Sequence, residues 1–124
     1  MKNITGIHHV SLVVADTTQS LAFYCGVLGL ETLDRPDLGY PGAWLAVGDK
    51  QIHLLELPNP DAVHGRPIHG GRDRHTAITV RRLDIISTAL EQADIHYTLS
   101  KSGRRALFCR DPDGNALEMI EISD

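Results

Sequence analysis

The sequence repeats itself after 65 or 66 residues. Segment 9–14, His-Val-Ser-Leu-Val-Val, resembles segment 75–80, His-Thr-Ala-Ile-Thr-Val. Segment 52–57, Ile-His-Leu-Leu-Glu-Leu, likewise resembles segment 117–122, Leu-Glu-Met-Ile-Glu-Ile. Such self-similarity indicates a chain built from copies of one structural unit. We therefore expect two units that fold alike and, in a chain of 124 residues, share a single core.

In the first half, the pattern predicts a strand, a helix and three further strands. Segment 7–14 has the β-branched, apolar composition of a strand. Asp16 is a suitable N-cap for a helix that extends to about Leu28, and Gly29 is a typical residue to end it. The next strands are expected at 30–33, 43–47 and 51–57, with a hairpin turn at 48–49.

The second half has the same order of elements. After strand 75–80, the apolar periodicity predicts a helix over 83–93. Strands are expected at 95–99, 104–109 and 116–122, and Asp-Pro-Asp-Gly at 111–114 makes the last turn. Segment 58–73, with three prolines and three glycines, is predicted to be an irregular linker. The single domain 1–124 thus contains two βαβββ repeats, at about 4–57 and 74–123, and is of the α+β class.

Side chains alternate between the two faces of a strand, and this alternation decides which polar residues meet. His9 and His75 lie opposite the apolar positions of their strands, so we expect them on the face away from the helices. His53 and Glu118 hold equivalent positions in the last strand of each half. If an approximate two-fold axis relates the halves, His9 maps onto His75 and His53 maps onto Glu118.

This symmetric placement predicts a metal site with three imidazoles and one carboxylate. Such a ligand set suits one divalent ion of the Zn²⁺, Ni²⁺, Fe²⁺, Co²⁺ or Mn²⁺ type better than Mg²⁺ or Ca²⁺. Two other residues compete for ligand positions, His8 with His9 and Glu56 with His53. The remaining histidines receive no role: His64 and His69 are expected to be solvated in the linker, and His96 has no counterpart in the repeat.

Charge and hydropathy exclude several classes of protein. A net charge of −4, without a run of like charges, argues against a nucleic-acid-binding protein. The sequence has no apolar stretch of membrane-spanning length and no signal-peptide pattern near its first residue, so we expect no membrane association and a cytoplasmic location. Cys25 and Cys109 form no CxxC pair and are expected to be buried free thiols.

Several motifs are similar to those of one known family. Ile7-His-His-Val-Ser-Leu-Val-Val-Ala-Asp16, followed by Ser20-Leu-Ala-Phe-Tyr24 and Leu28-Gly-Leu30, resembles the opening module of the vicinal oxygen chelate superfamily. Asp111-Pro-Asp-Gly-Asn-Ala-Leu-Glu118 resembles its closing motif, whose glutamate is a metal ligand. The group includes glyoxalase I, fosfomycin-modifying thiol transferases, methylmalonyl-CoA epimerase, extradiol dioxygenases and bleomycin-resistance proteins.

The resemblance implies a partly closed, cavity-containing sheet built from the two modules. It also implies a homodimer, with each site formed within one chain or across two. His9, His53, His75 and Glu118 match the four ligand positions of the family. Bacterial glyoxalase I has glutamate at the position of His53, so this chain departs from that enzyme at one ligand.

The resemblance further implies a glyoxalase-like lyase or isomerase acting on a small oxygenated substrate, with Glu118 transferring the proton. An arginine is expected to attract an anionic substrate and an aromatic side chain to line the cavity; the candidates are Trp44, Arg74, Tyr97, Arg104, Arg105 and Phe108. Three alternatives remain open: an extradiol-type dioxygenase that uses His9, His75 and Glu118 for Fe²⁺, a thiol transferase of the same fold, and a non-catalytic protein that binds a small molecule or metal.

Overall fold

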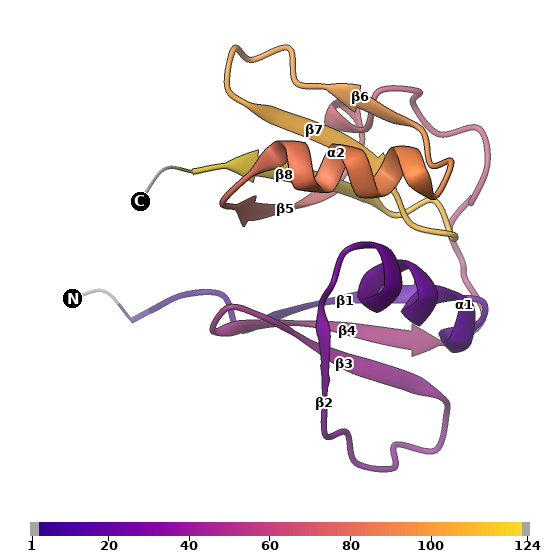
Figure 1. Cartoon of the computed structure of the whole chain (residues 1–124). Helices are drawn as coiled ribbons and strands as arrows, with labels where there is room; N and C mark the ends of the chain where they lie inside the picture. Colours follow the sequence, from indigo (N-terminus) through magenta and orange to yellow (C-terminus); the bar gives the residue numbers. More distant parts are fainter. Residues whose placement is uncertain (1–2, 123–124) are drawn as a thin grey trace.

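The computed structural model describes residues 3–122 as two four-stranded sheets, one for each half of the sequence (Figure 1). We refer to the halves as the first and second modules. The elements of the first module are β1 (His9–Val14), α1 (Thr17–Leu21), η1 (Ala22–Val27), β2 (Glu31–Leu33), β3 (Gly42–Val47) and β4 (Lys50–Glu56). The linker contains η2 (Gly70–Arg72), and the second module consists of β5 (His75–Val80), α2 (Leu83–Gln92), β6 (Tyr97–Leu99), β7 (Ala106–Arg110) and β8 (Ala116–Glu121).

The two sheets have the same topology. Their strand orders are β1-β4-β3-β2 and β5-β8-β7-β6. In each sheet the first strand of the module pairs in parallel with the last, and the remaining pairs are antiparallel. The prediction of two βαβββ modules is therefore confirmed. The sheets remain separate four-stranded units and do not join into one closed sheet.

The helix of the first module begins where its capping residue predicts. The carboxylate of Asp16 accepts a hydrogen bond from the backbone N–H of Gln19 at 3.1 Å, which satisfies one of the free donors of the first turn. The helix starts as α1 and continues as the π-helix η1. Gly29 follows with a positive φ of 79°, a conformation that glycine adopts without strain.

The helix of the second module lacks a side-chain cap of its own. Arg82 occupies the N-cap position and makes no capping hydrogen bond. Instead Glu121, at the end of β8, accepts a hydrogen bond from the backbone N–H of Leu83 at 3.0 Å. Glu56 at the end of β4 does the same for the backbone N–H of Thr17 at 2.8 Å. The last strand of each module therefore holds the start of its helix.

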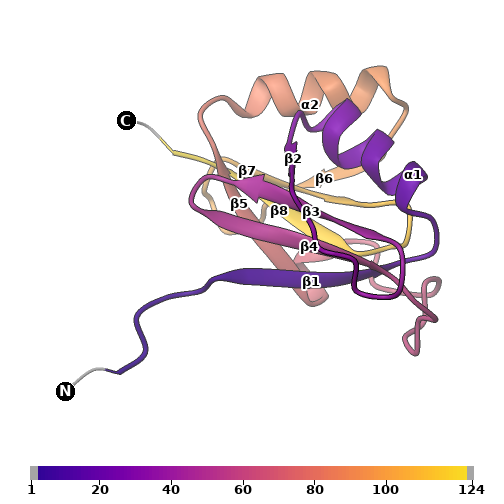
Figure 2. The same cartoon turned by 90° about the horizontal axis from the view of Figure 1, so that it is seen from below.

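Both modules contribute to one hydrophobic core. The two helices lie side by side on the same side of the molecule, over the sheets (Figure 2). The fully buried side chains include Tyr24 and Leu45 from the first module and Leu90, Leu107 and Met119 from the second, and they belong to one cluster. Burial of this apolar surface is the main driving force that holds the modules together.

A buried carboxylate joins the modules at one end. Asp111, which is 5% exposed, accepts hydrogen bonds from the Tyr24 hydroxyl at 2.7 Å and from the Asn115 side-chain amide at 2.9 Å. Its other oxygen accepts from the backbone N–H groups of Asp113 and Asn115, both at 2.9 Å. The Asn115 amide also donates to the carbonyl of Val13 at 3.2 Å. The predicted turn at 111–114 is thus also the contact between the second module and β1.

The linker packs against the second module. The prediction that His69 is solvated was wrong: its Nδ1 is hydrogen-bonded to the Thr98 hydroxyl at 2.7 Å, and its ring meets the Phe108 ring edge-on at 4.9 Å. A Cβ atom at Gly70 would come within 3.3 Å of the Phe108 side chain, so a small residue allows this close approach. Within residues 3–122, no helix combines the length and apolar character needed to span a membrane.

Replacing Asp111 with alanine should destabilise the protein strongly. The change leaves the Tyr24 hydroxyl and the donors of Asp113 and Asn115 without their buried acceptor. We expect the free energy of unfolding to fall by about 3–5 kcal/mol, measured by urea denaturation. Asp84→Ala removes an exposed carboxylate paired with Arg82 and should have a far smaller effect. Equal losses in the two variants would contradict the bridging role of Asp111.

The buried thiol should react only after unfolding. Burial, followed by the negative charge of Asp111, raises the pKa of the Cys109 thiol to about 12. At pH 8 its thiolate fraction is then on the order of one in ten thousand, and the thiolate is the reactive form. Cys25→Ala isolates this group, because Cys25 and Cys109 are the two cysteines of the chain. We expect a disulfide reagent to label this variant in denaturant and not in buffer; rapid labelling of the folded variant would contradict the expectation.

Candidate metal centre

Two predicted ligands of the first module lie together on the face of the sheet turned away from the helices. β1 and β4 pair so that His9 is opposite Gln51 and Ser11 is opposite His53, which makes His9 and His53 diagonal neighbours. Their rings stack at 3.8 Å between centroids. Trp44, directly opposite His53 on β3, stacks on His53 at 4.3 Å. We call His9, His53 and Trp44 the first half-site.

The second module repeats this arrangement in the same register. His75 is opposite Ala116 and Ala77 is opposite Glu118, so His75 and Glu118 are also diagonal neighbours. The Nε2 atom of His75 lies 3.2 Å from Oε1 of Glu118. Phe108, directly opposite Glu118 on β7, meets the His75 ring edge-on at 5.1 Å. We call His75, Glu118 and Phe108 the second half-site.

The proton of His75 is placed by its backbone neighbour. Nδ1 of His75 lies 2.9 Å from the carbonyl oxygen of Asp73. A carbonyl only accepts hydrogen bonds, so Nδ1 carries the proton. In a neutral ring, Nε2 then directs its lone pair at the Glu118 carboxylate, which is itself an acceptor. Two acceptors at 3.2 Å call for a cation between them, either a proton or a metal ion.

The environment of His53 favours the neutral imidazole. Burial, and then the positive charge of His9, His8 and Arg35, lowers the pKa of His53. Metal ions bind the neutral ring, so this shift favours ligation near neutral pH. Nε2 of His53 lies 2.7 Å from Oε1 of Gln51. Gln51 is not among the predicted site residues, although its position two residues before His53 in a strand places it on the same face.

The two competing residues occupy different surroundings. Glu56 lies on the helix side of its sheet, where it accepts the hydrogen bond from the Thr17 backbone described above. His8 is exposed, and its Nδ1 lies 2.8 Å from Nδ1 of His9. Neither makes a contact with His53 comparable to the stacking of His9.

Of the residues considered for substrate contact, the structure brings some to the half-sites and not others. Trp44 and Phe108 belong to them directly. Arg74 forms an ion pair with Asp61 at 2.7 Å and lines a cavity beside His75. The others lie elsewhere: the Tyr97 hydroxyl donates to Glu91 of α2 at 2.6 Å, Arg104 donates to the Ser102 hydroxyl at 3.2 Å, and Arg105 pairs with Glu121.

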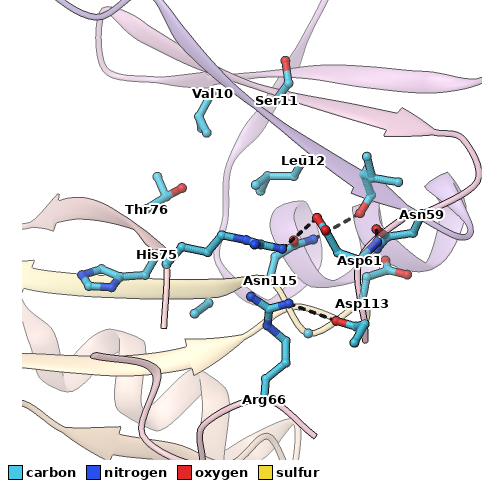
Figure 3. Close-up of a pocket in the computed structure, with 15 residues that line it drawn as sticks. Val10, Ser11, Leu12, Asn59, Asp61, Arg66, His75, Thr76, Asp113 and Asn115 are labelled. Atoms are coloured by element: carbon cyan, nitrogen blue, oxygen red, sulfur yellow. Dashed lines mark hydrogen bonds and ion pairs between the residues drawn. The ribbon is translucent and has the colours of Figure 1, made fainter. Parts of the chain in front are cut away.

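The half-sites border two cavities. One, of about 290 Å³, lies where β1, the linker and the turn before β8 meet, and Figure 3 shows Leu12, Asp61, Arg66 and His75 around it. The other, an open cleft of about 1020 Å³ between β1 and β5, is lined by His9 and His75. Across residues 3–122, no three His, Cys, Asp or Glu side chains are grouped so that they could hold a metal ion. One chain thus presents two half-sites of two donors each.

Comparisons with known proteins identify relatives by sequence and by fold. The chain is 30% identical over 123 residues to a protein of Arabidopsis thaliana named Glyoxylase I 4, covering 94% of this chain and 71% of the relative. It is 30% identical over 125 residues to the lactoylglutathione lyase of Salmonella typhimurium, covering 94% and 92%. A solved structure of a Bacillus anthracis protein ascribed to the glyoxalase family has the same fold, with a TM-score of 0.81 at 24% identity and coverage of 98% of both chains.

The family assignment follows from sequence as well as from fold. The model of the Glyoxalase/Bleomycin resistance protein/Dioxygenase superfamily matches residues 6–119, which include both modules and all four predicted ligands. This chain belongs to the Glyoxalase/Bleomycin resistance protein/Dioxygenase superfamily.

Proposed function

We propose that the protein is a metal-dependent, glyoxalase-like lyase or isomerase that acts on a small oxygenated substrate. His9, His53, His75 and Glu118 would hold one divalent ion. The observation that carries this proposal is the matching register of the two half-sites, together with the distance of 3.2 Å between Nε2 of His75 and the buried carboxylate of Glu118 in the second one. Three imidazoles and one carboxylate fit a borderline divalent ion. The names of the relatives in Arabidopsis and Salmonella support the reaction class.

The proposal includes a homodimer whose sites are shared between chains. Each half-site offers two donors, whereas such an ion takes at least four ligands counting water and substrate. The first half-site of one chain, placed against the second half-site of a partner, supplies all four donors. By two-fold symmetry the same contact forms a second site, because a residue pair in such an interface occurs twice.

In this proposal, different residues of the chain transfer the proton, exclude water and attract the substrate. A divalent ion bound here would supply electrostatic stabilisation for negative charge that develops on the substrate oxygens. Glu118, 6% exposed, would accept a proton from the carbon beside the substrate carbonyl and return it to the neighbouring carbon. Trp44 and Phe108 would keep water away from this carboxylate, and Arg74 would attract an anionic substrate.

Complementation between two inactive variants tests the shared site. One variant carries His9→Ala and His53→Ala, and the other carries His75→Ala and Glu118→Gln. Each alone should fail to bind Ni²⁺, measured by quenching of Trp44, the single tryptophan of the chain. After subunit exchange, half of the dimers are mixed and have one complete site, so about a quarter of the wild-type Ni²⁺ stoichiometry should return. No return of binding would contradict a site shared between chains.

The carboxylate tests the reaction. With methylglyoxal and glutathione as substrates, Glu118→Gln should lower kcat by roughly 10²- to 10⁴-fold, because the amide cannot accept the proton. Glu56→Gln is the matched control: its amide oxygen still accepts from the Thr17 backbone, and turnover should stay near that of the wild type. Catechol cleavage by the iron-loaded protein would instead favour a dioxygenase. Binding of a small ligand with turnover of neither substrate would favour a sequestering role.

A further inference from the structure

A partly buried ion cluster holds the end of the linker beside the second half-site. The Asp73 carboxylate accepts two hydrogen bonds from Arg66, both at 2.7 Å, and one from Arg110 at 2.8 Å. The backbone N–H of Arg74 donates to it at 2.8 Å. The Asp73 side chain is only 8% exposed. Paired, fork-shaped contacts of this kind fix geometry more firmly than a single surface ion pair.

The two arginines extend this cluster to the surrounding backbone. Arg110, the last residue of β7, donates to the carbonyls of Gly114 at 2.7 Å and Pro67 at 2.5 Å. Arg66 donates to the carbonyl of Ala62 at 3.0 Å. These bonds fasten segment 62–73 to β7 and to the turn that precedes β8. Contacts with the second module therefore set the position of Asp73.

The backbone of Asp73 contacts a predicted ligand directly. Its carbonyl accepts the Nδ1 proton of His75 at 2.9 Å, and Nε2 of the same ring lies 3.2 Å from Oε1 of Glu118. Partners of this kind fix the tautomer and ring orientation of metal-binding histidines. His75 also lines the same cavity as Arg66 (Figure 3).

The first module shows that the fold does not need this cluster. The residue equivalent to Asp73, two positions before His9, is Ile7, and it is exposed. β1 and β4 nevertheless pair in the same register as β5 and β8. Because the first module folds in the same way without such a cluster, we attribute to the Asp73 cluster a role other than folding of the module.

We propose that Asp73, fixed by Arg66 and Arg110, is a positioning residue that keeps His75 protonated on Nδ1 and turned so that its Nε2 can bind the metal. The inference rests on the proposed function for the identity of the ligand. The geometry that it invokes exists without metal, so it has a measurement of its own.

The first measurement is the tautomer of His75 in metal-free protein, read from its ¹⁵N chemical shifts. In the wild type, Nδ1 should carry the proton. In Asp73→Asn, the neutral amide loses the charged pairing with both arginines, the linker loosens, and the Nε2-protonated form should appear. Arg66→Gln keeps the pairing with Arg110 and should shift the tautomer in the same direction to a smaller extent. It also serves as the test if Asp73→Asn does not fold.

The second measurement is the Ni²⁺ affinity of the same variants, read from quenching of Trp44. Loss of the hydrogen-bond partner of a metal-binding histidine typically weakens metal binding by 10- to 100-fold. Asp111→Asn is the control for general destabilisation: it should lower stability yet leave the His75 tautomer unchanged.

An unchanged His75 tautomer in both Asp73→Asn and Arg66→Gln overturns the inference, and so does an altered tautomer with wild-type Ni²⁺ affinity. A wild-type protein that shows the Nδ1 tautomer and binds no metal overturns the proposed function, and the tautomers of the variants still decide whether Asp73 positions His75.

Discussion

The hydrogen bonds of the buried Asp111 carboxylate determine how the two modules meet. Each module could form its sheet alone, but its helix and sheet would leave apolar surface uncovered. The shared core removes that surface from water without specifying a unique orientation, because hydrophobic contacts are not directional. Asp111 adds direction: it accepts from Tyr24 of η1 and fixes the turn whose Asn115 reaches β1. Since an unpaired buried carboxylate is costly, other arrangements of the modules are disfavoured.

The repeat explains why the half-sites match in such detail. In both sheets the histidine of the first strand and the ligand of the last strand are diagonal neighbours, and a small residue, Ser11 or Ala77, stands opposite the ligand. An aromatic residue, Trp44 or Phe108, stands opposite the ligand on the next strand. The two copies differ in charge: His53 is a neutral imidazole where Glu118 is a carboxylate. Of the two half-sites, the second is the one that carries a carboxylate, so in the metal centre that we propose it would attract the cation electrostatically.

Much of this arrangement could be predicted from the sequence, because it depends on local rules. Side-chain alternation paired His9 with His53 and His75 with Glu118, each pair on one face of its own sheet, and the capping residue Asp16 located the start of the first helix. Contacts between distant segments could not be read in this way. The capping of α1 by Glu56 depends on strand pairing, and the contact of His69 with Thr98 depends on the path of an irregular linker. Neither contact leaves a periodic signal in the sequence. Glu56 was therefore considered as a ligand, and His69 was expected to be solvated.

The two modules place their predicted ligands at equivalent positions, but the linker makes the surroundings of these ligands different. Duplicated modules supply equivalent positions, but segment 62–73 occurs once and covers only the second half-site. His75 is therefore oriented by a backbone carbonyl held in an ionic cluster, whereas the Nδ1 atom of His9 lies against the exposed ring of His8. The histidine of the second half-site is held by a backbone carbonyl. In the shared site that we propose, this pair would define the geometry and the pair from the other chain would adjust to it. Preorganisation of one pair would lower the entropic cost of forming the proposed shared site, because only the other pair of ligands would have to be ordered when the chains meet.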